Sequence, residues 1–81
     1  MSEIQAMAET AQRLLRDEAA QEVLAMMRAE AVHKWEQALT LEMREAAWHD
    51  QAAVARFENG LHALADRGVV EQIVEQRQKF I

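Results

Sequence analysis

Three histidines are the residues best suited to chemistry, because imidazole is a common metal ligand and a base that titrates near neutral pH. Glu30 and His33 have the E-x-x-H spacing that carboxylate-bridged di-iron sites use in four-helix bundles. At about 100° per residue, however, His33 falls on the helix side opposite the apolar residues Ala31 and Trp35. A di-iron ligand must point into the bundle, so the sequence favours a solvated surface histidine.

The stretch MREAAWHDQAAV, residues 43–54, places Trp48, His49 and Asp50 side by side. On a helix the three point in different directions. His49 points toward water, and Asp50 points toward the apolar stripe of the same helix, which is centred on Val54. Trp48 falls roughly 120° from that stripe at the usual helical step. The catalytic interpretation of this cluster is therefore weak.

Nucleophilic and phosphate chemistry find little support. The chain has no cysteine, its only serine is Ser2, and its only threonines are Thr10 and Thr40, so a nucleophile beside a base is hard to assemble. No Gly-rich phosphate loop and no histidine pair at i and i+4 occur. We expect no enzyme activity, no metal and no cofactor; a metal-binding helical-bundle enzyme using Glu30 with His33, or His49 with Asp50, is the least favoured alternative.

The composition predicts helices, because the 81 residues include no proline, only two glycines and many strong helix formers. Ser2 is a candidate N-cap for a first helix, Asp17 for a second and Thr40 for a third. Gly68, after Arg67, is a typical C-terminal signal for the third helix. No glycine or proline separates the first two helices, so they could also fuse.

The apolar spacing of the third helix stays in phase across the Asn59-Gly60 turn signal, so we expect the helix to continue through it. The predicted fold is all-α and a single domain, residues 1–81. It is an antiparallel hairpin of two long helices, with a shorter N-terminal helix and a short C-terminal helix after Gly68. A chain of this size buries only about 60 to 65% of its unfolded surface, so we expect it to self-associate into a helical bundle.

The chain has more apolar surface than a single hairpin can bury, so several side chains need another cover. Asp50 lies at the edge of the buried stripe, contacts Arg28 across the hairpin, or acts as a specificity device in an oligomer. Trp48 is covered by the first helix or the C-terminal tail, the commoner outcome in a small chain, or it faces a partner. The interface candidates are Trp48, Asp50, Met26, Val70, Ile73, Phe80 and Ile81.

The charge balance excludes several partners. With 14 acidic and 9 basic residues the net charge is -5, which repels nucleic acid and anionic lipid. The longest apolar run, Val23 to Met27, is far below the roughly 18 residues that span a bilayer. The N-terminal sequence lacks signal-peptide features. We therefore expect a cytoplasmic protein whose partner is another protein or itself, with neither nucleic acid nor membrane involved.

Three stretches, RLLRDEAAQEVLAMMRAEAVHKWEQ, REAAWHDQAAV and LHALADRG, resemble small all-helical proteins encoded among tailed-bacteriophage and prophage structural genes. The shared positions are Leu14, Leu15, Asp17, Trp35, Arg44, Glu45, Trp48, Leu61 and Gly68. The resemblance implies a virion-assembly or head-associated role through protein contacts, in the host cytoplasm or the virion. It implies no catalytic residues.

A phage-type inhibitor that binds a host protein is the alternative function. Its nucleic-acid-mimicking version would need carboxylates gathered on one face. Here the acidic residues alternate along the chain with basic ones, namely Arg13, Arg28, Lys34, Arg44 and Arg56.

Overall fold

The computed structural model describes residues 2–79, and these form three helices. They are α1 (Glu3–Arg16), α2 (Glu18–Glu36) and α3 (Leu41–Lys79). No strand occurs between residues 2 and 79, so the all-α prediction is confirmed. Phe80 and Ile81, two of the predicted interface residues, lie outside the described residues.

Each of the three predicted N-caps is confirmed. The hydroxyls of Ser2 and Thr40 and the carboxylate of Asp17 each accept a hydrogen bond from the backbone N–H three residues later, at 3.1, 3.1 and 2.8 Å respectively. Ser2 also forms a capping box, because its N–H donates to Oε1 of Gln5 at 3.1 Å. These bonds satisfy N–H groups that the first turn of a helix leaves without partners.

Asp17 also separates α1 from α2. Its backbone is extended, with φ -74° and ψ 123°, and its N–H donates to the carbonyl of Leu14 at 3.3 Å. The side chain then caps α2, so one residue ends the first helix and begins the second. The two helices therefore do not fuse, although neither glycine nor proline lies between them.

Replacing Asp17 by alanine should lower the free energy of unfolding by about 1 kcal/mol. The substitution removes the acceptor for the N–H of Ala20 and places a strong helix former where the chain must bend. Urea denaturation of Asp17→Ala and Asp17→Asn measures the effect, and the asparagine variant should stay near wild type because its amide oxygen can still cap. Equal losses in both variants would assign the effect to the charge of Asp17 instead.

α3 is one continuous helix of 39 residues. The predicted continuation through Asn59 and Gly60 is confirmed. The predicted end at Gly68 is wrong, and so is the separate C-terminal helix. Neither glycine has a positive φ, so Gly68 is not a left-handed C-cap; it lies instead where α1 approaches α3 closely, and a Cβ added there would be 2.2 Å from that of Ala8.

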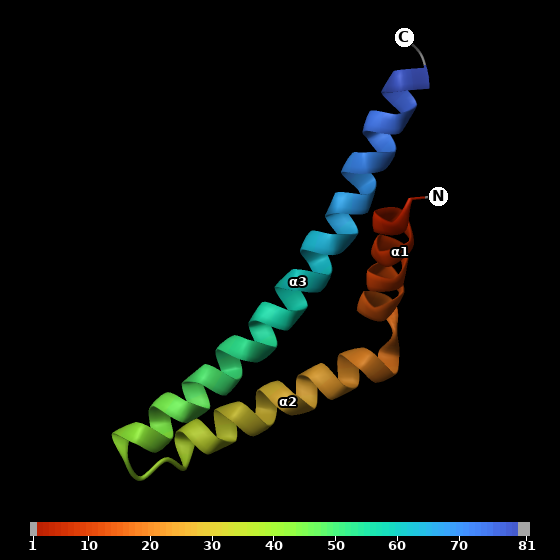
Figure 1. Cartoon of the computed structure of the whole chain (residues 1–81). Coiled ribbons are helices and arrows are strands. Elements are labelled where there is room, and N and C mark those ends of the chain that lie inside the picture. The colour runs from red at the N-terminus through yellow and green to blue at the C-terminus, as the bar shows by residue number, and fades with distance from the viewer. Residues whose placement is uncertain (1, 80–81) are drawn as a thin grey trace.

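α1 and α2 both pack along α3 and contact each other much less (Figure 1). Nε2 of Gln5 donates to Oε2 of Glu75 at 3.0 Å, which places α1 beside the C-terminal half of α3. An ion pair between Arg28 and Glu58 joins α2 to the middle of α3. The chain measures 63 × 24 × 15 Å. Its radius of gyration of 17.8 Å exceeds the roughly 12 Å of a compact 81-residue domain.

The buried apolar core consists mostly of small side chains. Its members are Ala8, Ala11, Leu24, Ala31, Ala47, Val54 and Ala65. Fifteen large apolar side chains of the described residues are exposed by contrast, including both tryptophans. The three helices therefore leave most of their larger apolar groups uncovered.

Candidate protein-binding surfaces

Both residues of the E-x-x-H pair lie on the surface. His33 is exposed, and Oε1 of Glu30 lies 3.3 Å from Nζ of Lys34, one turn along the same helix. Within residues 2–79, no three side chains of histidine, aspartate or glutamate converge in a way that could hold a metal ion.

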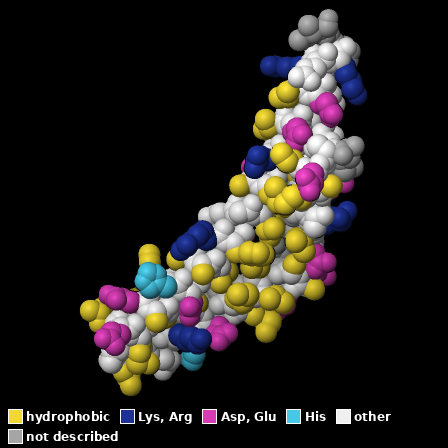
Figure 2. All heavy atoms as spheres, in the orientation of Figure 1, with side chains coloured by type: hydrophobic (Ala, Val, Ile, Leu, Met, Phe, Trp, Pro, Cys, Tyr) yellow, Lys and Arg dark blue, Asp and Glu magenta, His cyan; other side chains and the backbone are white. Residues whose placement is uncertain are grey.

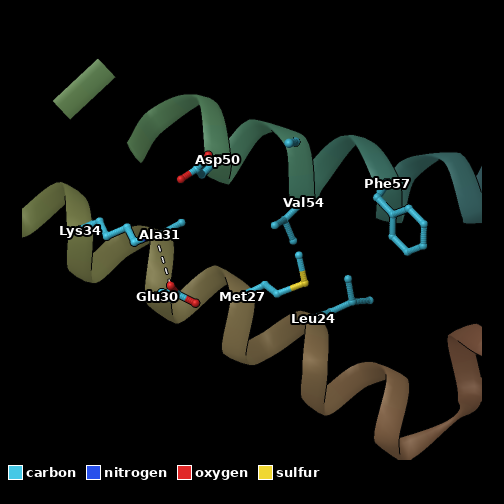
Figure 3. Close-up of a pocket in the computed structure, with 9 residues that line it drawn as sticks. Leu24, Met27, Glu30, Ala31, Lys34, Asp50, Val54 and Phe57 are labelled. Atoms are coloured by element: carbon cyan, nitrogen blue, oxygen red, sulfur yellow. Dashed lines mark ion pairs between the residues drawn. The ribbon is translucent and has the colours of Figure 1, made fainter. Parts of the chain in front are cut away.

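Trp48, His49 and Asp50 are all exposed, but they do not diverge as fully as helical spacing predicts. The rings of Trp48 and His49 lean together edge to face, with centroids 5.2 Å apart and planes at 73°. Asp50 instead points into the space between α2 and α3 (Figure 3). Trp48 and His49 therefore lie on one surface and Asp50 lies on another.

The side chain of Trp48 is 57% exposed. It lines a shallow hollow with Val32, Trp35, Glu36 and Gln51, and the guanidinium of Arg44 lies 5.6 Å from the ring centroid of Trp35. The expected cover by the first helix or by the C-terminal tail, as far as residue 79, is wrong. α1 packs against the other half of α3, and the described residues that line the hollow with Trp48 all belong to α2 and α3.

Of the alternatives for Asp50, the contact with Arg28 does not occur, because Arg28 pairs with Glu58 two turns further along α3. Asp50 forms no ion pair with any described residue. It lines the same hollow as Glu30 and Lys34 of α2. Its carboxylate is therefore available to a cation from outside the chain.

An elongated apolar groove runs along one face of α3. In its first part Leu24, Met27 and Val54 point toward one another between α2 and α3 (Figure 3). Phe57 lies beside them and is 58% exposed. The second part lies between α1 and α3 and includes Leu61; because Phe57 and Leu61 are one helical turn apart, the two parts lie end to end.

We call this surface the front groove. Its apolar lining is Met7, Leu14, Leu24, Met27, Val54, Phe57, Leu61 and Leu64, and its charged residues are Glu3, Glu30, Lys34 and Asp50. Figure 2 shows hydrophobic side chains gathered over the region where α1 and α2 meet α3.

A second apolar surface lies on the other side of α3. At about 100° per residue, Val70, Ile73 and Val74 fall roughly 140 to 240° around the helix from Gly68, the residue against which α1 packs. Val70 is 59% exposed and Ile73 is 50% exposed. Asp66 and Arg67 lie beside these residues at one end and Arg77 at the other. We call the set of six residues the tail patch.

Sequence reasoning placed Val70, Ile73 and Asp50 among the interface candidates but missed Met27, Phe57 and Leu64. At helical spacing Phe57 and Leu64 fall in line with the buried Val54, which is typical of core positions. The signal that could have identified them is the width of the apolar stripe on α3, because α1 and α2 cover only one flank of it. Met26, another candidate, is exposed on α2 and lines neither part of the front groove.

Positive and negative side chains alternate over the face seen in Figure 2, with no continuous acidic area. None of the helices within residues 2–79 has the length and apolarity that crossing a membrane requires. No protein-family model, curated protein or solved structure matches the chain.

Proposed function

We propose that this chain is a non-enzymatic helical module that works by binding protein, and that it first associates with itself. α2 and α3 form its antiparallel hairpin, and association completes a helical bundle around the front groove. The observation that supports the proposal is the amount of surface the single chain exposes, most of whose large apolar side chains are uncovered.

The accessible surface of the chain is 6593 Å². A folded monomer of 9.3 kDa exposes about 5,000 Å², so this chain has about 1,600 Å² more than its mass requires. A standard interface removes about 800 Å² from each partner. The excess is therefore large enough for stable association, and the chain has no disulfide that could stabilise a small core in another way.

Virion assembly is the setting we propose, and it rests on the resemblance to small phage structural proteins. The inhibitor alternative draws less support from the surface. A mimic of nucleic acid needs a continuous run of carboxylates, whereas the visible face carries mixed charge (Figure 2). The exposed apolar side chains suit contact with protein.

The melting temperature should rise with protein concentration, because association stabilises the folded chain by mass action. Sedimentation across the micromolar range should show species larger than a monomer. Thermal melts followed by circular dichroism at the same concentrations measure the shift. A well-folded monomer, whose melting temperature neither depends on concentration nor rises with a partner from its native host, would contradict the proposal.

A further inference from the structure

We infer that the tail patch of one copy docks into the front groove of a second copy, so that chains associate head to tail. The inference rests on the proposed self-association and names its two surfaces. The front groove and the tail patch lie on different sides of α3, so one chain can use both at once.

The chemistry of the tail patch suits a helix lying in an apolar groove. Val70, Ile73 and Val74 recur at i, i+3 and i+4, which is the spacing of the anchors in helix-in-groove recognition. The front groove offers them Met27, which is 47% exposed, and Phe57, which is 58% exposed, beside the buried Leu24 (Figure 3). Both surfaces lack a cover among the described residues.

The net charges of the two surfaces are opposite, because the tail patch carries two arginines and one aspartate while the front groove carries three carboxylates and one lysine. Arg67 and Arg77 bracket the apolar residues of the tail patch, Asp66 lies beside Arg67, and none of the three forms an ion pair within residues 2–79. The front groove has carboxylates toward both ends, with Glu3 in one part and Asp50 in the other. Its single lysine is held by Glu30. Two grooves facing each other would instead pair two surfaces of net negative charge, and two tail patches would pair two surfaces of net positive charge.

The exposed area fits two contacts per chain. The excess of about 1,600 Å² equals two patches of about 800 Å², the share of one partner in a standard interface. A symmetric dimer with an interface of standard size would use only one such patch per chain. A head-to-tail chain uses two, and repetition of that contact forms a ring or an open filament.

Two variants of the full chain, each lacking one surface, test the inference. Phe57→Arg places a cation in the groove, where it opposes the arginines of the tail patch. Ile73→Glu places a carboxylate in the tail patch, where it opposes the acidic groove. We expect wild type to sediment as species larger than a dimer and each variant alone to be monomeric. An equimolar mixture should form a 1:1 dimer and nothing larger, because one intact groove and one intact tail patch remain.

Failure of the mixture to associate would overturn the inference, and so would either variant assembling alone as wild type does. If a lone variant loses helix because folding needs the contact, recovery of helical circular dichroism on mixing supports the inference and absence of recovery overturns it. Leu39→Arg is the matched control, since Leu39 is 90% exposed outside both surfaces and should leave assembly unchanged. Wild type that assembles normally while the mixture fails would retain the proposed self-association and remove only this geometry.

Charge reversal tests the ionic part of the contact in the same mixture. Adding Asp50→Lys to the Ile73→Glu copy should weaken the mixed dimer about threefold to tenfold. Arg67→Glu or Arg77→Glu in the Phe57→Arg copy should restore affinity, depending on which arginine meets Asp50. Weakening with no rescue by either arginine variant would remove the assigned pairing.

Discussion

Gly68→Ala is expected to lower the free energy of unfolding by about 1–3 kcal/mol, the usual cost of overpacking a tight contact. The new Cβ would lie 2.2 Å from Cβ of Ala8, a separation that real atoms do not tolerate. α1 must then move away from α3, and the tight packing of Ala8 and Ala11, each 2% exposed, loosens. Urea denaturation at one fixed concentration measures the change.

Gly60→Ala is the matched control for Gly68→Ala, because the two glycines lie in the same helix. No atom lies within 4 Å of a Cβ added at Gly60, so that variant gains helix propensity and should be more stable by about 1 kcal/mol. The same substitution thus has opposite signs at two positions. Stabilisation of both variants would show that α1 does not approach α3 at Gly68.

Ala8→Gly should rescue Gly68→Ala. With the methyl group of Ala8 removed, the nearest atom to the new Cβ would be Cα of residue 8 at 3.7 Å, an ordinary contact. A double-mutant cycle should therefore give a favourable coupling between residues 8 and 68. Additive losses would assign the effect of Gly68→Ala to α3 alone.

The local parts of this fold follow from local chemistry, which is why they were predictable. Ser2, Asp17 and Thr40 each act on a backbone N–H three residues away, so the sequence nearby contains all the groups involved. The continuation of the helix through Gly60 is also a local property. A glycine inside a helix costs only about 1 kcal/mol where no other element packs against it.

The features that escaped prediction depend on contacts between distant parts of the chain. Gly68 looks like a helix end unless it is known that Ala8 lies against it. Trp48 was expected to be covered because the pattern does not show which half of α3 receives α1. Asp50 and Glu58 are both candidate partners of Arg28 across the hairpin. Only the register of α2 on α3 decides that Glu58 forms the ion pair.

The same distinction applies to the candidate surfaces. Val70 and Ile73 were predicted to be interface residues because their apolar face had no partner in the predicted hairpin. Phe57 was not recognised, because its periodicity on α3 is that of a core residue. Phe57 is nevertheless 58% exposed, beside the two helices α1 and α2 that meet at a bend at Asp17 (Figure 1).

Leu24→Ala is expected to cost about 2–4 kcal/mol, within the range found for buried leucines. Leu24 is only 6% exposed and is the largest buried apolar side chain among the described residues. It faces Met27 and Val54 on the floor of the front groove (Figure 3), where the other buried side chain of α2 is Ala31. Removing it should loosen α2 from α3, and denaturation in urea at fixed concentration reports the loss.

Met26→Ala is the control, because it removes a side chain of similar size from the same helix at a position that is 62% exposed. Its cost at low concentration should be within about 0.5 kcal/mol, as for surface substitutions generally. An equal loss in both variants would contradict the assigned core of α2. A loss in Met26→Ala that grows with protein concentration would instead place Met26 in a contact between copies, because only association depends on concentration. The pair of variants therefore separates the side chains that hold one chain together from those that join chains.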